Sequence, residues 1–123
     1  MQPLYEDEHL LVFEKPSGLL SVPGRGPDKQ DCLSKRVQDI YTDALVVHRL
    51  DQDTSGLIVM ARGIEAQRRI SRLFETRQVS KRYMAVVAGN PLLTQTHVSP
   101  NEEGWRAIEG NILLDWERRP IHI

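Results

Sequence analysis

The sequence predicts an α+β fold in which a sheet of short strands is flanked by helices. Three observations lead to this prediction: several β-rich runs, two segments with the apolar spacing of amphipathic helices, and turn residues between them. The chain has 123 residues, enough for one hydrophobic core but not for two. We therefore expect one domain over residues 1–123.

The composition is that of a globular protein that folds in water. Hydrophobic residues make up 40% of the chain and charged residues 27%. No apolar run approaches the roughly 20 residues that cross a bilayer, and the acidic start MQPLYEDEHL does not resemble a signal peptide. Cys32 is the only cysteine, which suits a reducing compartment and a buried structural thiol. We expect a cytoplasmic protein with no membrane partner.

The N-terminal part predicts a strand and then a long loop. The strand covers residues 9–14 and ends before Pro16 and Gly18, because proline removes a backbone donor and glycine favours turns. The loop at 16–27 holds three prolines and three glycines, which excludes a helix. Its apolar residues are expected to attach it to the core: Leu19, Leu20 and Val22.

A first helix is predicted from a cap at Asp28 or Asp31 to about Tyr41. Its apolar residues fall on one helical face: Leu33, Val37, Ile40 and Tyr41. A second amphipathic helix is predicted over residues 63–77, with the arginines facing outward. The residues expected to face inward are Ala66, Ile70, Leu73 and Phe74. A strand is predicted in KRYMAVVAG, residues 81–89, and a weaker one at 111–114.

Between the helices, two β-rich runs flank a polar segment. The runs are ALVVHRL from Ala44 and LIVMA from Leu57, and DQDTSG between them has the composition of a loop. The motif HRLDQDTSGLIVMAR, from His48 to Arg62, therefore lies at a strand end and its loop, where catalytic groups often occur.

Positive charge is concentrated after this motif, although the whole chain carries a net charge of only -1. Residues 62–82 hold seven basic and two acidic side chains, a local charge of +5. Such clustering is typical of a surface that binds a nucleic-acid backbone. The alternative is a solvated helix in which Glu65 pairs with Arg68 and Arg69.

Three chemistries compete for the motif. A metal site would use His48 and Asp51, but the other histidines are scattered, at positions 9, 97 and 122. A hydrolase triad would use Ser55, His48 and Asp51, but these residues are crowded together and no G-x-S-x-G turn is present. The third possibility uses Asp51 alone as nucleophile or proton acceptor, with Arg49 and His48 supporting an anionic substrate. A surface Arg-Asp pair followed by a simple turn is the plain alternative.

HRLDQDTSGLIVMAR closely resembles the signature of the RluA-like pseudouridine synthases: His-Arg-Leu-Asp, two variable residues, Thr-Ser-Gly and an aliphatic strand ending in Ala. EKPSGLLSVPGR, residues 14–25, resembles the family's Lys-Pro-Ser/Ala-Gly-Leu element, and VSKRYMAVVAG, residues 79–89, resembles its Lys-x-Tyr strand. The three motifs stand in register within residues 4–89. The run at 16–25 looks most like the branch that acts on ribosomal and transfer RNA.

This resemblance implies an RNA pseudouridine synthase that isomerises uridine to pseudouridine in ribosomal or transfer RNA, without a metal or other cofactor. It implies a mixed, mainly antiparallel sheet flanked by helices. By position, Asp51 matches the essential aspartate, Arg49 the arginine that fills the space of the flipped-out nucleotide, and Tyr83 the tyrosine that stacks on the target base.

The other residues of the resemblance are expected to support these three. His48 would orient the loop, and Thr54, Ser55 and Gly56 would shape it. The RNA backbone is expected to contact six basic residues: Arg62, Arg68, Arg69, Arg72, Lys81 and Arg82.

The resemblance weakens after Gly89. The family's Gly-Arg-x-His-Gln-Leu-Arg-x-His motif is absent, and ILLDWERRP at 112–120 is only faintly similar to a family segment. A truncated catalytic domain is therefore expected, with an open sheet edge that favours self-association, for example as a homodimer. Because the family's basic partner of the aspartate lies in the missing part, we expect little turnover by this chain alone. A non-catalytic RNA-binding module is the alternative function.

Overall fold

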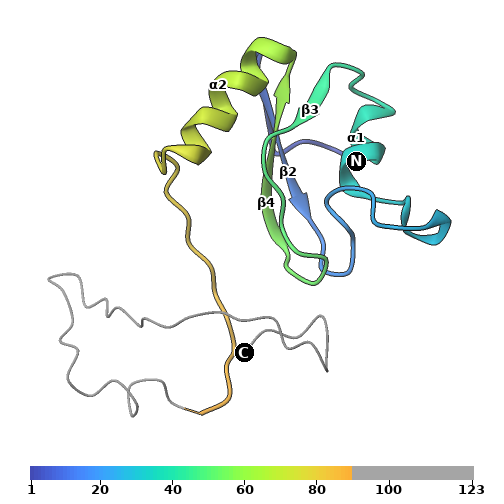
Figure 1. Cartoon of the computed structure of the whole chain (residues 1–123), viewed down its shortest axis with the longest axis vertical. Helices are drawn as coiled ribbons and strands as arrows, with labels where there is room; N and C mark the ends of the chain where they lie inside the picture. Colours follow the sequence, from blue (N-terminus) through green and yellow to red (C-terminus); the bar gives the residue numbers. More distant parts are fainter. Residues whose placement is uncertain (90–123) are drawn as a thin grey trace, which may run out of the picture. The chain divides into compact units, whose positions relative to one another are not determined.

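The computed structural model describes residues 1–89, and the chain divides into two units, Met1–Lys81 and Arg82–Ile123. The first unit contains the elements of Figure 1: β1 (Tyr5–Glu6), β2 (Leu10–Lys15), a 3-10 turn (Pro27–Lys29), α1 (Leu33–Gln38), β3 (Ala44–Val46), β4 (Gly56–Arg62) and α2 (Ile64–Glu75). Within residues 1–89, no helix has the length and apolar character needed to cross a membrane. The predicted α+β class is confirmed.

The four strands form one antiparallel sheet in the order β1-β2-β4-β3. Its centre is the pairing of β2 with β4, which runs from Leu10 opposite Ala61 to Lys15 opposite Gly56. This pairing places the end of β2 beside the start of β4. The loop that follows β2 and the loop that precedes β4 therefore lie at the same end of the sheet.

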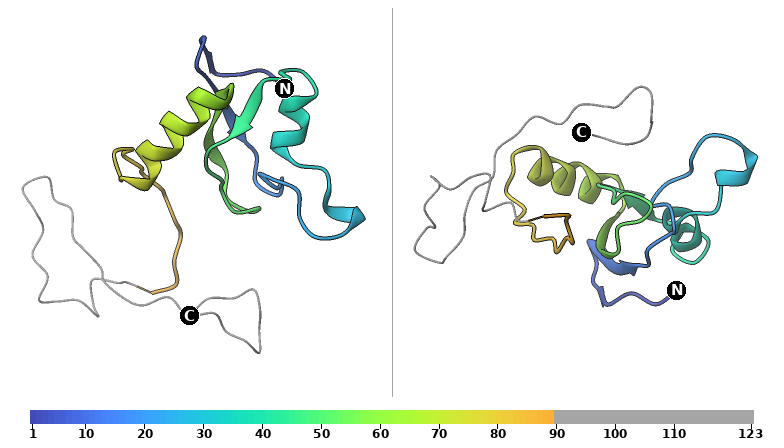
Figure 2. Two further views of the ribbon diagram at one scale, coloured as in Figure 1. Left: turned by 45° about the horizontal axis from the view of Figure 1, so that its top comes forward. Right: turned by 90° about the horizontal axis from the view of Figure 1, so that it is seen from below.

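Successive side chains of a strand point to opposite faces of the sheet, so the two faces carry different side chains. Each face is covered by a different helix. α1 packs on the face that carries the alternating apolar residues of the central strands. The buried members of this core are Leu11, Phe13, Leu33, Val37, Ala44, Ile58 and Met60. α2 lies on the other side of the sheet, as the views in Figure 2 also show.

The first predicted helix is present, but its predicted cap is wrong. Cys32, in extended conformation, is the N-cap of α1, and its side chain makes no capping hydrogen bond. The carboxylate of Asp31 instead accepts hydrogen bonds of 2.9 and 2.7 Å from the guanidinium of Arg36, so it is already engaged. Asp28 lies in the preceding 3-10 turn, and the helix ends before Tyr41. The predicted burial of Cys32 is confirmed.

The second predicted helix is confirmed, but it begins one residue later and ends two residues earlier than predicted. The strand predicted after it, at residues 81–89, is wrong. No residue of α2 is fully buried, and Leu73 is 41% exposed, so the apolar stripe of α2 is only partly covered. Residues 81–87 have no regular structure, and Met84 and Val86 are completely exposed. A strand needs the hydrogen-bond ladder of a neighbouring strand, and none of the strands described within residues 1–89 pairs with this segment. The segments predicted at 111–114 and 112–120 lie outside the described residues.

The edge strand β1 was not predicted, and it is short. Its two residues, Tyr5 and Glu6, pair with Val12 and Leu11 and are exposed. A short edge strand presents few unpaired backbone N–H and C=O groups with which a second chain could pair. Self-association through a sheet edge stays a prediction.

Candidate active site

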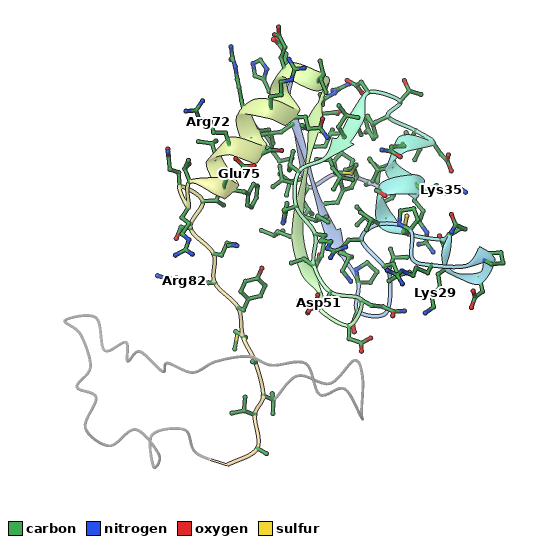
Figure 3. All side chains as sticks on the ribbon, in the orientation of Figure 1. Lys29, Lys35, Asp51, Arg72, Glu75 and Arg82 are labelled. Atoms are coloured by element: carbon green, nitrogen blue, oxygen red, sulfur yellow. The ribbon has the colours of Figure 1, made fainter. Side chains whose placement is uncertain are left out.

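Asp51 lies at one end of the sheet, in the loop that joins β3 to β4 (Figure 3). Its side chain is exposed, so a substrate can reach the carboxylate. The loop that follows β2 lies at the same end and binds the backbone on both sides of Asp51. The residues that make these bonds define the geometry of the candidate site.

The side chain of Lys15, the last residue of β2, is fully buried at this end of the sheet. Its ammonium group donates hydrogen bonds to the carbonyl oxygens of Pro16 at 3.0 Å, Leu19 at 2.6 Å and Gln52 at 2.8 Å. An ammonium has three donors, so this arrangement satisfies it. Burial lowers the pKa of Lys15, and the negative charges of two loop aspartates oppose that shift. Lys15 thus ties the loop after β2 to the residue that follows Asp51.

Ser17 and Gly18 bind the same stretch of backbone. The N–H of Gly18 donates to the carbonyl of Gln52 at 2.8 Å, and the side-chain amide of Gln52 donates to the carbonyl of Gly18 at 3.1 Å. The hydroxyl of Ser17 donates to the carbonyl of Asp53 at 2.7 Å. Gly18 has φ of +93°, a conformation that side chains rarely adopt, so this exchange of hydrogen bonds favours glycine.

His48 connects the start of the Asp51 loop to β4 and α2. The backbone N–H of Val59 donates to its Nε2 at 2.9 Å, so this nitrogen carries no proton. The imidazole stacks on the ring of Phe74 with a centroid distance of 4.5 Å and an interplanar angle of 18°. Burial lowers the pKa of His48, and the positive charge of Lys81 lowers it further. These contacts suit the orienting role expected of His48.

The remaining motif residues are arranged around Asp51. The N–H of Thr54 donates to the carbonyl of Asp51 at 3.1 Å and closes a turn. Gly56 has φ of +139°, another conformation that favours glycine. Arg49 and Ser55 are exposed on the same loop.

The competing chemistries find little support in this geometry. Nε2 of His48 is occupied by a backbone hydrogen bond from β4, so that nitrogen does not serve Ser55 as a base. Among residues 1–89, no three His, Cys, Asp or Glu side chains gather closely enough to hold a metal ion.

The predicted phosphate-binding residues of α2 are exposed. Arg68, Arg69 and Arg72 have exposed side chains, and Figure 3 shows Arg72 pointing away from the sheet. Glu65, in the first turn, is exposed as well. Arg68 and Arg72, one helical turn apart, line one surface of α2, whereas Arg69 lies on another, beside Arg62 and Ile70.

The other basic residues have different surroundings. Arg62 binds the carboxylates of Asp43 at 3.0 Å and Glu6 at 3.5 Å, and the ammonium of Lys81 lies 6.0 Å from the ring centroid of Phe74. Arg82 and Tyr83 belong to the second unit, where Tyr83 is 62% exposed. The structure thus gathers His48, Arg49, Asp51, Thr54 and Ser55 in one loop.

Sequence reasoning missed the roles of Lys15 and of Ser21, whose buried hydroxyl binds the backbone of Leu50. Both are polar residues in or beside a loop rich in proline and glycine, where exposure is the usual expectation. One signal was available for Lys15: strand alternation places it on the same face as Leu11 and Phe13. No comparable local pattern marks Ser21.

Comparison with known proteins identifies the class to which the chain belongs. A family model described as RNA pseudouridylate synthase matches residues 9–118, and the chain belongs to that family. Within it, the chain is RluA-like. It is 43% identical over 117 residues to the dual-specificity RNA pseudouridine synthase RluA of Yersinia pestis, and 43% identical to that of Escherichia coli K12.

The chain spans about half the length of the curated relatives it matches. The aligned segment is 95% of this chain but 52% of the Yersinia pestis protein and 49% of the Escherichia coli protein. A solved structure of human RNA pseudouridylate synthase domain containing 4 aligns with 62% of this chain and 30% of its own, at 30% identity and a TM-score of 0.49.

Removing the ammonium of Lys15 should destabilise the first unit. In Lys15→Met, carbonyl oxygens of two loops lose a buried donor, and we expect the free energy of unfolding to fall by about 2–4 kcal/mol. Urea denaturation of variant and wild type measures the difference. Lys35→Met, on exposed α1 surface, is the control and should change stability by no more than about 0.5 kcal/mol. Equal stability of Lys15→Met and wild type would contradict the role of this group.

Stability should depend on the protonation of His48. Burial holds the pKa of His48 in the folded chain below the ordinary histidine value of about 6.5, so between these two values the unfolded state binds more protons. The contribution of neutral His48 to the free energy of unfolding is therefore complete above about pH 6.5, and it is lost as the pH falls through the lowered pKa of the folded state. Thermal unfolding across this range should show a shallower pH dependence in His48→Gln, whose amide oxygen accepts the Val59 bond without titrating. His9→Gln, at an exposed histidine, should keep the wild-type slope; identical slopes for all three proteins would count against the prediction.

Proposed function

We propose that this chain acts on RNA as a pseudouridine synthase, converting uridine to pseudouridine with Asp51 as the catalytic carboxylate. One observation carries the proposal: Asp51 is exposed, while the backbone next to it is fixed by hydrogen bonds from buried or loop residues. A fixed backbone with a free carboxylate is the arrangement that a nucleophile or base requires. Family membership supports the same chemistry.

The reaction breaks the bond between uracil N1 and ribose C1′ and forms a bond between C5 and C1′. The proton on C5 is lost, and N1 gains one, so the product is an isomer of uridine. Asp51 can take part by attacking C1′ or by removing the proton from C2′. Both routes need the carboxylate in its ionised form beside the sugar.

Access to the uridine requires that it leave the base stack, at a cost of a few kcal/mol. We assign Arg49 to the space that the nucleotide vacates and Tyr83 to stacking on the extruded base. A guanidinium and an aromatic ring both offset the cost of unstacking. The exposure of Arg49 on the Asp51 loop supports its part in this step. His48, Thr54 and Ser55 complete the loop that receives the base.

The exposed arginines of α2 are proposed to contact the RNA backbone. Arg68, Arg69 and Arg72 can neutralise phosphates without giving up another partner named above. Lys81 and Arg82 would extend this surface along the chain. Arg62 would have to exchange its bonds to Asp43 and Glu6 for a phosphate, so we expect it to contribute least.

Ribosomal and transfer RNA are the proposed substrates, because residues 16–25 resemble the branch that acts on both. The relatives' names describe an RNA enzyme of dual specificity, which is consistent with this choice. We also propose a cytoplasmic site of action, because ribosomal and transfer RNA are the proposed substrates. The chain spans about half of these relatives, so turnover is expected to be slow. Whether product formation depends on Asp51 is therefore more informative than the absolute rate of product formation. RNA binding without turnover would instead favour a non-catalytic RNA-binding module.

Replacing Asp51 should abolish turnover without abolishing RNA binding. Release of tritium from RNA labelled at uridine C5 measures the loss of the C5 proton directly. We expect Asp51→Asn to reduce this release by at least roughly a hundredfold, because the reacting carboxylate is gone. Asp53→Asn removes an exposed carboxylate two residues away and should stay within about threefold of wild type. Release that is equal in Asp51→Asn and wild type would refute the assignment, and absence of release from wild type would refute turnover by this chain.

Neutralising the basic face of α2 should weaken RNA binding and its dependence on salt. In the double variant Arg68→Gln and Arg72→Gln, we expect the slope of log affinity against log salt to decrease in magnitude by about 1–2. Fluorescence anisotropy with labelled RNA at several salt concentrations gives this slope. Lys35→Gln, on the other side of the sheet, is the matched control and should leave the slope unchanged. A double variant with the wild-type slope would place the RNA elsewhere.

A further inference from the structure

Ser21 makes an unusual pair of hydrogen bonds with the residue that precedes Asp51. Its hydroxyl donates to the carbonyl oxygen of Leu50 at 2.6 Å and accepts from the backbone N–H of Leu50 at 3.0 Å. Ser21 is 3% exposed and Leu50 is 7% exposed. One side chain therefore satisfies both backbone groups of a buried loop residue, a role that an adjacent strand normally fills.

Ser21 is itself held in place by α1. Its carbonyl oxygen accepts from the N–H of Ser34 at 3.0 Å, and the carbonyl of Leu20 accepts from the N–H of Leu33 at 2.7 Å. Both donors are in the first turn of α1, where helical N–H groups lack partners within the helix. A continuous path of hydrogen bonds thus joins the start of α1 to Leu50.

Ser21 and Lys15 hold the Asp51 loop on opposite sides. Lys15 binds the carbonyl of Gln52, after Asp51, and Ser21 binds Leu50, before it. Without the Ser21 hydroxyl, the N–H and carbonyl of Leu50 would both lose their partner in a buried environment. Buried backbone groups without hydrogen-bond partners are costly. Leu50 would therefore move to a position where water can bind its N–H and carbonyl, and Asp51 would move with it.

We propose that Ser21 is a positioning residue for Asp51, which fixes the catalytic carboxylate through the backbone of Leu50. The inference rests on the proposed synthase function. Ser21 acts through its neighbour and touches no reacting atom. Because displacements of about 1 Å can lower a catalysed rate by two orders of magnitude, loss of Ser21 should reduce kcat far more than it changes KM.

The test compares Ser21→Ala, Ser21→Thr and Ser34→Ala. Ser21→Thr keeps the hydroxyl, and Ser34→Ala removes a second buried serine hydroxyl, which contacts the sulfur of Cys32. Two quantities are measured on the whole chain: hydrogen exchange of the Leu50 amide relative to core amides such as that of Ile58, and tritium release from 5-labelled uridine in RNA.

In Ser21→Ala we expect the Leu50 amide to exchange at least about tenfold faster than in wild type, which is the factor expected from the loss of one ordinary hydrogen bond. The exchange rates of the core amides should not change. We also expect kcat to fall at least about tenfold and KM to stay within about twofold. Ser21→Thr should restore both quantities to within about threefold, and Ser34→Ala should leave both unchanged.

Unaltered Leu50 exchange in Ser21→Ala, or an equal acceleration of all core amides, would overturn the proposal. So would faster exchange with an unaltered kcat. If wild type releases no tritium, the proposed function fails for this chain, while Leu50 exchange still decides whether Ser21 holds the loop. If Ser21→Ala does not fold, Ser21→Cys supports the same comparison, because its somewhat larger thiol fills the space of the hydroxyl but is a much weaker hydrogen-bonding group.

Discussion

The buried ammonium of Lys15 is the interaction on which the candidate active site depends. Strand alternation directs this side chain to the core face at the last residue of β2, where a charge without partners would be costly. The partners are carbonyl oxygens of two different loops, at Pro16, Leu19 and Gln52. Those loops must converge for Lys15 to be buried, and their convergence fixes where Asp51 lies.

The sheet separates the tasks of stability and recognition. The face covered by α1 holds the hydrophobic core, and the first turn of α1 also donates a backbone hydrogen bond to the carbonyl of Ser21. Its other face carries α2, which is half-buried and presents its arginines to solvent. The stack of His48 on Phe74 joins this second layer to the loop of Asp51. The surface proposed to bind RNA and the loop proposed to carry catalysis are thus both attached to the β2–β4 pair.

Local patterns predicted the central strands, the existence of both helices and the position of the Asp51 loop, because hydrophobic periodicity and turn residues are properties of neighbouring residues. The cap of α1 was missed because Asp31 pairs with Arg36 instead of the helix end. The strand expected at 81–89 failed because a ladder needs a neighbour that propensity does not report. Lys15 and Ser21 were missed because their burial depends on partners 37 and 29 residues away.

These sequence separations also bear on the order of folding. Contacts that close long loops form late, since the entropy of closure must be overcome before they contribute. During synthesis, residue 15 emerges well before Gln52, and β2 has no central partner until β4 has been made. The ammonium of Lys15 must therefore stay hydrated in the early chain. The loop that presents Asp51 therefore acquires its geometry only after β4 is available to pair with β2, and a partly folded chain has the side chains of the site without their arrangement.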